Sequence, residues 1–420
     1  MINDHTLMRF ERFGKDLLKP IYADYSFANL PATFHYLLTG EETGPLLPPD
    51  CFGGSYPKPK RIVLIFIDSF GWHFWQRYAE RSHLMRRVIE EGVLTPISAL
   101  FPSTTSASVS TLNFGSLPAQ HSIYEWNMYV PAYGETIQSL AFTTLGKRAV
   151  SCIEKGYDVT VMVPERETMH QRLERRGARS IQLAHRNYAY SAFNSIASAG
   201  AEVIPHRTLP EALVHLHDVL AAAPDKALIN LYWAGLDTAA HLSGPDTPVH
   251  EAEVTAFWAT MDVLLGNIEN RDTLLFFTAD HGQIGVDAAD TLYINETIPE
   301  IAGCLATSAT GQIIWPNGSP RDMFLHVKAE RRAEVYRTLK DHLSGIAEIL
   351  TVDDALEAGL FGEAPVGEEL RRRLGDLLVL PRAGHFVWWR EPGIVENFFH
   401  GHHGGLTKEE LITATGVLGG

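Results

Sequence analysis

Runs of apolar residues divide this chain into strand-like and helix-like segments. Residues 61–72 (RIVLIFIDSFGW) contain six consecutive apolar residues, a pattern typical of a strand buried on both faces. Residues 226–241 and 271–285 each repeat an apolar run that leads to an acid. Helical spacing of apolar residues lies between these strands, at 73–92 and 250–270. This alternation predicts an α/β fold with a mostly parallel sheet sandwiched between helices.

The remaining segments carry weaker patterns. From them we expect an aromatic and polar loop at 117–135, a strand at 157–163, a helix at 164–177, two helices within 187–223 and a final helix after Thr407.

The pattern changes again near residue 311, where short strands alternate with charged helices. The 420 residues exceed what a single small core needs, so an insertion or a second domain is expected. We interpret 311–384 as a small inserted α/β subdomain. The core domain would comprise 55–310 and 385–420, with 1–54 as a leading segment packed on it.

A dense cluster of hydroxyl groups follows a Phe-Pro pair in residues 101–115 (FPSTTSASVSTLNFG). Apolar residues then recur at helical spacing up to Gly115, so a helix is expected to begin at Thr104, Thr105 or Ser106. Unpaired backbone N–H groups and the helix dipole at such an end favour an anion such as phosphate.

Acids follow the three strongest strands. They are Asp68, Asp237 and Asp280, and the last two have a histidine close by, at His241 and His281. Ligand sites in α/β sheets usually form at the carboxyl ends of strands. Three further histidines lie in a Gly-rich loop near the C-terminus: His400, His402 and His403.

Carboxylates and imidazoles together suit Zn²⁺, or else Mn²⁺, better than Ca²⁺ or Mg²⁺, which prefer oxygen ligands. Two such ions can clamp the attacking and leaving oxygens of a phosphoryl transfer, and can lower the pKa of a threonine hydroxyl so that it attacks at neutral pH. We therefore predict that the hydroxyl cluster, the acids and the histidines belong to one metal-dependent site for phosphoryl transfer.

Composition limits the other possibilities. The formal net charge of −15 argues against a nucleic-acid polymer as the main partner. Three widely separated cysteines suggest neither a disulfide framework nor a thiolate metal site. The polar N-terminus and the lack of a long apolar run give no sign of a secretion signal or a membrane span. A cytoplasmic location is the expectation, and the sequence does not indicate the oligomeric state.

Five motifs carry a resemblance to a known family. In order along the chain, IFIDSFG, FPSTTSASVSTLNFG, GLDTAAH, TADHGQIG and HHGGLT resemble the alkaline phosphatase superfamily. They are most similar to its type I phosphodiesterase and nucleotide pyrophosphatase group. The resemblance spans residues 60–410 and implies an alkaline-phosphatase-like core.

The same resemblance implies two metal sites and a threonine nucleophile. One ion would be held by Asp68, Asp280 and His281, with the Thr105 oxygen towards it. The other would be held by Asp237, His241 and His403, because the family's last ligand directly precedes a glycine. His400 and His402 would then support the loop or the ligands.

The nucleophile is assigned by position within FPSTT. Thr105 is the fifth residue of that motif and occupies the family's nucleophile position, with Thr104 and Ser103 as alternatives. The family's phosphate-binding asparagine falls by direct count on Trp126. Asn127 beside it, or the backbone N–H of Ser106, would then bind the phosphate.

These implications predict a hydrolase of phosphodiesters or pyrophosphates that acts through a phospho-threonine intermediate on a small phosphorylated substrate. Alternatives within the superfamily are a phosphomonoesterase, a phosphonate hydrolase and a phosphomutase. The sulfatase pattern of Cys or Ser followed by Pro-x-Arg does not occur in the cluster. A metal-containing binding protein without catalysis is the non-enzymatic alternative.

Overall fold

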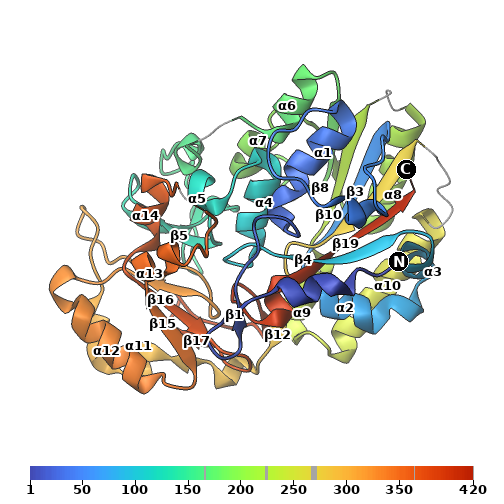
Figure 1. Cartoon of the computed structure of the whole chain (residues 1–420). Coiled ribbons are helices and arrows are strands. Elements are labelled where there is room, and N and C mark those ends of the chain that lie inside the picture. Colours follow the sequence, from blue (N-terminus) through green and yellow to red (C-terminus); the bar gives the residue numbers. More distant parts are fainter. Residues whose placement is uncertain (165–166, 223–225, 266–271, 364, 420) are drawn as a thin grey trace.

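A seven-stranded sheet forms the centre of the computed structural model, which describes residues 1–420 except 165–166, 223–225, 266–271, 364 and 420 (Figure 1). The strand order is β4-β19-β11-β3-β10-β8-β9. The strands are β3 (Arg61–Ile67), β4 (Val93–Ser98), β8 (Arg179–His185), β9 (Glu202–His206), β10 (Ala227–Trp233), β11 (Thr273–Thr278) and β19 (Ile412–Gly419). Within this sheet only β19 runs antiparallel to its neighbours. The predicted fold class is therefore confirmed.

Helices cover both faces of this sheet, because alternate residues of each strand point to opposite sides. Val63, Ile65 and Ile67 of β3 pack in one core with α2 (Trp72–Tyr78), α3 (His83–Glu90), α8 (Leu209–Ala222) and α10 (Pro248–Leu265). Ile62 and Leu64, which alternate with these residues along β3, pack on the other face. The helices there are α1 (Leu30–Thr39), α4 (Thr105–Phe114) and α6 (Met169–Arg175).

A second, three-stranded antiparallel sheet lies beside the first (Figure 1). It comprises β14 (Met323–Leu325), β16 (Leu377–Pro381) and β15 (Ala347–Thr351), with the helices α12 (Arg332–His342), α13 (Val352–Glu357) and α14 (Glu368–Leu374). These elements fall within the subdomain expected at 311–384. The domain boundaries stay a prediction. β17 (Val387–Trp388) pairs with β13 (Leu292–Tyr293), and both strands pack in one apolar cluster with β14 and β16.

Two expectations about short segments are wrong. The predicted strand at 157–163 contains a 3₁₀ helix, Val159–Met162. The Asp158 side chain accepts a hydrogen bond from the Thr160 N–H at 2.9 Å, and this local bond favours the turn over an extended chain. The predicted loop at 117–135 instead contains α5 (Pro118–His121) and the hairpin strand β5 (Asn127–Val130), which pairs with β6 (Glu135–Gln138).

Two predicted helices have other boundaries in the structure, and local signals explain the differences. The helix expected at 73–92 divides into α2 and α3, since the Ser82 hydroxyl caps a new helix at the Met85 N–H. Thr407 precedes only one helical turn, α15 (Lys408–Leu411), before β19 begins. Residues 165–166 and 266–270 of the two predicted helices that contain them lie outside the described residues.

A buried histidine gives the fold a testable pH dependence. Burial lowers the pKa of His170 from 6.5 to about 4. The unfolded chain gains that proton below about pH 6.5, whereas the folded chain does not until about pH 4, so stability is lost as the pH falls between these values. We expect His170→Gln to reduce the loss of unfolding free energy between pH 7 and pH 5 by about 2 kcal/mol, measured by urea denaturation.

The exposed His342 provides the control for that measurement. His342→Gln is expected to leave the difference between the two pH values as it is in the wild-type protein. Equal pH dependence in the His170 variant and the wild type would contradict the prediction.

Candidate active site

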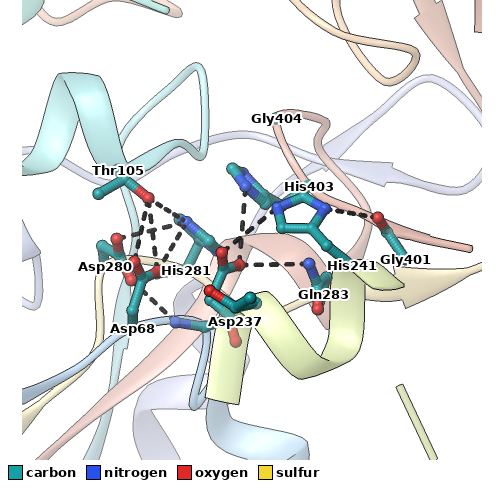
Figure 2. Close-up of polar contacts among 12 residues, drawn as sticks. Asp68, Thr105, Asp237, His241, Asp280, His281, Gln283, Gly401, His403 and Gly404 are labelled. Carbon is teal, nitrogen blue, oxygen red and sulfur yellow. Dashed lines mark hydrogen bonds and ion pairs between the residues drawn. The ribbon is translucent and has the colours of Figure 1, made fainter. Parts of the chain in front are cut away.

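Three acids meet at one edge of the main sheet because their strands are neighbours in it. Asp68 directly follows β3, and Asp280 lies two residues beyond β11. Asp237 lies in the first turn of α9 (Gly235–Ser243), the helix after β10. Strands β11, β3 and β10 are adjacent and parallel, so their carboxyl ends lie at the same edge of the sheet. Figure 2 shows the three acids close together there.

In the first cluster, the Thr105 hydroxyl lies beside Asp68 and His281. Its Oγ1 lies 3.4 Å from each carboxylate oxygen of Asp68 and 3.2 Å from Nε2 of His281 (Figure 2). The same Nε2 lies 3.5 Å from Asp68 Oδ1 and 3.3 Å from Asp280 Oδ2. One ligand atom each from Asp68, Asp280 and His281 therefore fall within 4.8 Å of one another.

The second cluster is centred on Asp237. His241 Nε2 lies 3.4 Å from one of its carboxylate oxygens, and His403 Nε2 lies 3.9 Å from the other. The rings of His403 and His281 stack with centroids 3.7 Å apart. His281 therefore also falls within 4.8 Å of Asp237 and His403, and the two clusters are contiguous. All seven residues that the resemblance assigned to metals come together here (Figure 2).

Backbone carbonyls orient the three histidines. A carbonyl only accepts, so a ring nitrogen beside it must be the N–H donor, and the other nitrogen is left with its lone pair. In each ring the donor is Nδ1, which leaves Nε2 towards the acids. The acceptors are Gly282 O for His281 at 3.0 Å, Gly401 O for His241 at 2.7 Å and Ser103 O for His403 at 2.9 Å.

Burial perturbs the ionisation of these groups. It raises the pKa of Asp237 to about 7, and it raises the pKa of Asp68, where the nearby Asp280 charge adds to the effect. Burial also lowers the pKa of His281 to about 3 and that of His403 well below 6.5. The histidines are thus held in the neutral form that binds metals, while the buried acids favour a strong positive charge between them.

The donor set fits divalent ions. Asp280 Oδ2 is a buried oxygen that accepts no hydrogen bond, although it faces the cluster. A carboxylate oxygen left this way is costly unless a cation binds it. Mixed carboxylate and neutral imidazole ligands are typical of Zn²⁺ and Mn²⁺ sites. The residues present therefore fit the two-ion arrangement.

Among the three candidate hydroxyls, the structure brings Thr105 to the acids. The Ser103 hydroxyl instead donates to the Gly405 carbonyl at 2.8 Å. Thr104 is the residue before α4, and its hydroxyl hydrogen-bonds with the Glu125 carboxylate. Thr105 is the first residue of α4, so the expected helix starts where the sequence suggested.

The groups expected to bind phosphate are less completely placed. The Asn127 side-chain amide donates to the Gly318 carbonyl at 3.2 Å, and Asn127 and Trp126 both line the cavity beside the acids. Ser106 lies in the first turn of α4, where backbone N–H groups have no partner within the helix. The Ser106 hydroxyl accepts a hydrogen bond from the Ser139 hydroxyl at 3.2 Å, and the Ser106 backbone N–H is the group expected to bind phosphate.

The two remaining histidines of the C-terminal loop differ. His402 is buried, with its ring centroid 5.1 Å from that of His241, and it lines the cavity. His400 points elsewhere: its Nδ1 lies 3.9 Å from Asp287, and only its backbone N–H reaches back, to the His241 carbonyl. The first can support the ligands directly, and the second anchors the loop to α9.

Sequence reasoning missed two partners of the acids. The Tyr232 hydroxyl of β10 donates to Asp68 Oδ2, and the Gln283 side chain donates to Asp237 Oδ1 at 3.2 Å. Gln283 lies inside the TADHGQIG motif, so that motif already contained the signal. Tyr232 lies in an apolar strand, and no sequence signal distinguishes it from a core residue.

The C-terminal loop is held by a fully buried ion pair. Arg321 Nη2 lies 2.9 Å from Glu410 Oε2, and neither side chain is exposed. Glu410 also accepts from the Gly405 N–H at 3.0 Å and from the Thr407 hydroxyl at 2.6 Å. The pair therefore fixes the turn that follows His403.

A cavity of about 800 Å³ opens beside the clustered acids and histidines. Thr105, Asp68, Asp237, His241 and His403 all contribute to its wall. A nucleophile candidate, candidate metal ligands and a cavity large enough for a small organic substrate therefore coincide.

Fold and site together define a phosphoester hydrolase with an alkaline-phosphatase-like core, and the comparison with family models agrees. The model of type I phosphodiesterases and nucleotide pyrophosphatases matches residues 62–406, and the chain belongs to this family. No curated protein gave a significant match.

Solved structures share the fold at low identity. Murine ectonucleotide pyrophosphatase/phosphodiesterase 5 is 16% identical with a TM-score of 0.63, covering 86% of this chain and 88% of that one. An inactive threonine-to-alanine form of the murine protein in complex with AMP gives 15% and 0.64, covering 85% and 87%. Phosphonoacetate hydrolase from Sinorhizobium meliloti 1021, in complex with phosphonoacetate, gives 17% and 0.59, covering 86% and 90%.

The comparisons do not address membrane association or the location in the cell. No helix in the described part of the chain has the length and apolar character to cross a membrane. The cytoplasmic location stays a prediction.

Proposed function

We propose that this chain is a two-metal phosphodiesterase that acts through a phospho-threonine intermediate. The observation that carries the proposal is the position of Thr105 Oγ1, 3.4 Å from both oxygens of Asp68 and 3.2 Å from His281 Nε2. A hydroxyl at a helix N-terminus among metal-binding residues is the arrangement that an activated nucleophile needs.

Two groups of residues would hold the ions. Asp68, Asp280 and His281 form the site nearer Thr105, and Asp237, His241 and His403 form the other. Divalent ions bound there would supply the positive charge that lowers the pKa of the nucleophile and stabilises the phosphate oxygens and the leaving oxygen. Zn²⁺ is the first choice for this ligand set and Mn²⁺ the second.

The chain's own residues would carry the two steps. Thr105 Oγ loses its proton to solvent and attacks phosphorus, so a new Oγ–P bond forms as one ester bond breaks and an alcohol leaves. Water then attacks the same phosphorus, the Oγ–P bond breaks and Thr105 regains a proton. The Ser106 N–H, in the first turn of α4, and the Asn127 side chain, which lines the cavity, would bind a phosphate oxygen during both steps.

The relatives support this proposal in outline. A threonine-to-alanine change accompanies inactivity in the AMP-bound murine structure, as expected of a threonine nucleophile. The phosphonoacetate hydrolase has the same fold, so a phosphonate hydrolase is the second candidate. The carboxylate of such a substrate would need a positive group of its own, apart from the ions that bind the phosphorus oxygens, and a substrate comparison tests this directly.

Trapping the intermediate is the decisive experiment for the proposed function. We expect protein loaded with Zn²⁺ or Mn²⁺ to hydrolyse bis(p-nitrophenyl) phosphate. After acid quenching, peptide mass spectrometry should find a p-nitrophenyl phosphoryl group on Thr105, because the covalent step precedes hydrolysis. Turnover without any modified threonine would contradict the mechanism, and protein dialysed against a chelator is the control.

A further inference from the structure

The cavity beside the acids extends along one face of α4, away from the nucleophile. Thr105, Val109 and Asn113 are four residues apart, share that face and all line the cavity. Eight residues of α-helix span about 12 Å. We call this extension the α4 slot, lined by Val109, Asn113, Gln182, Asn194 and Asn230.

The floor of the α4 slot is polar, although it is formed by the middle of the main sheet. Gln182 of β8 and Asn230 of β10 are direct partners across two neighbouring strands. Their chain neighbours Ile181 and Ile229 pack in the apolar core on the opposite face. A parallel sheet covered by helices normally presents apolar side chains on both faces, so two amides side by side indicate a ligand.

One of these amides has an unused hydrogen-bonding atom. The Asn113 Oδ1 atom lies 2.8 Å from Gln182 Nε2 and 2.7 Å from His170 Nε2, so the far end of the slot is ordered. The Asn230 Oδ1 atom is buried and has no hydrogen-bond partner. Buried polar atoms are rarely left without one, and this acceptor faces the cavity.

The charges around the cavity are all negative. Among the residues that the structure describes, no lysine or arginine lines it, whereas Asp68, Asp237, Glu125 and Glu396 do. The first two belong to the proposed metal sites. Glu396 is already paired with Lys147, whose Nζ lies 3.2 Å away. A second anionic group on a substrate would thus meet acids without a compensating cation.

Resting on the proposed phosphodiesterase function, we infer that the substrate is a phosphodiester whose only charge is at the reacting phosphate. The substituent in the α4 slot is neutral and extends about 12 Å from the phosphate. It has apolar sides that contact Val109 and a hydrogen-bonding end that reaches Asn230 and Gln182. Pyrophosphates and carboxylated phosphonates do not meet this description.

Three p-nitrophenyl esters separate length from charge. Methyl p-nitrophenyl phosphate is short and neutral beyond the phosphate, the p-nitrophenyl ester of thymidine 5′-phosphate is long and neutral, and its 3′-phosphate derivative is long and anionic. We expect kcat/KM for the thymidine ester to exceed that of each of the others by about tenfold or more. Equal values for the thymidine ester and its 3′-phosphate would overturn the inference.

A substitution that fills the slot tests the location. Val109→Trp is expected to lower the ratio of kcat/KM between the thymidine and methyl esters by about tenfold. Val214→Trp, on the exposed side of α8 and 51% exposed, is the matched control and should leave the ratio unchanged. A ratio unchanged in both variants would place the substituent elsewhere.

Binding decides the question independently of turnover and of the Val109 variant. Calorimetric titration of the metal-loaded Thr105→Ala protein should give a Kd about tenfold or more lower for the thymidine ester than for its 3′-phosphate. Equal or reversed affinities would refute the inference even if the wild-type enzyme hydrolyses both. Absence of hydrolysis together with the expected order of affinities would refute only the proposed function.

Discussion

Replacing Thr105 with alanine is expected to lower kcat/KM for p-nitrophenyl phosphodiesters by about 10⁴-fold, because removal of a covalent nucleophile leaves only binding and electrostatic stabilisation. The partly buried Thr105 side chain makes its polar contacts at Oγ1, with Asp68 and His281. The loss should therefore appear without a large change in folding stability. Stopped assays of p-nitrophenolate release, with thermal unfolding in parallel, measure both quantities.

Three other substitutions distinguish the role of this hydroxyl from that of its neighbours. Thr105→Ser keeps an attacking oxygen and is expected to retain part of the activity. Ser103→Ala and Thr104→Val remove hydroxyls that the structure commits to Gly405 and Glu125, so their effects should be far smaller than that of Thr105→Ala. Full turnover by Thr105→Ala, or a larger loss in either neighbour, would disprove the assignment.

The sequence predicted the strands whose side chains are apolar on both faces. Residues 62–67 of β3 and the run in β11 carry this signature because helices cover them on both sides, and β10 carries it except at Asn230. Strand β8 was missed because Ser180 and Gln182 interrupt its apolar residues. Gln182 lines the α4 slot, so a polar position on the cavity side of β8 interrupts the apolar pattern on which strand prediction depends.

Strand β19 was missed for a different reason. Its residues Ile412–Gly419 follow a helix-capping threonine, and they include two glycines and three small polar or alanine positions. The small residues fit where β19 inserts between β4 and β11, and Gly416 faces Val88 and Trp75 closely. That constraint comes from tertiary packing between segments distant in sequence, and no local pattern expresses it.

The candidate site was more predictable than the fold around it. Asp68 and Asp280 were visible because an acid at the end of an apolar strand is a local signal, and the family resemblance supplied His403 and Thr105. The hydrogen bond of Tyr232 to Asp68 was not visible, since it depends on the register between β10 and β3. The division of the ligands between two ions stays a prediction.

Replacing Asp280 with asparagine is expected to have the second largest effect. The loss of one carboxylate ligand should lower bound metal by about one ion and kcat/KM by about 10³-fold, since an ion supplies several kcal/mol of charge stabilisation. Metal analysis of the purified variant and diester hydrolysis at saturating Zn²⁺ measure the two outcomes. Wild-type activity with two bound ions would contradict the role given to Asp280.

The same substitution should stabilise the protein once metal is removed with a chelator. Burial raises the pKa of Asp280 to about 7. The folded chain therefore holds that proton more tightly than the unfolded chain, and stability falls as the pH rises from about 4 through about 7. Asparagine has no charge to desolvate and still accepts from the Ser69 and His281 N–H groups at Oδ1.

The stabilising effect should accordingly depend on pH. Chelator-treated Asp280→Asn should unfold at a higher temperature than chelator-treated wild type at pH 8, and the difference should disappear near pH 4, where both side chains are neutral. Asp262→Asn is a useful comparison, because the Asp262 carboxylate accepts a hydrogen bond from the Leu84 N–H in the first turn of α3 at 2.7 Å. We expect this substitution to destabilise the protein. A residue kept for stability would behave like Asp262. If Asp280→Asn raises the unfolding temperature and Asp262→Asn lowers it, the Asp280 carboxylate destabilises the metal-free fold and is there to bind metal.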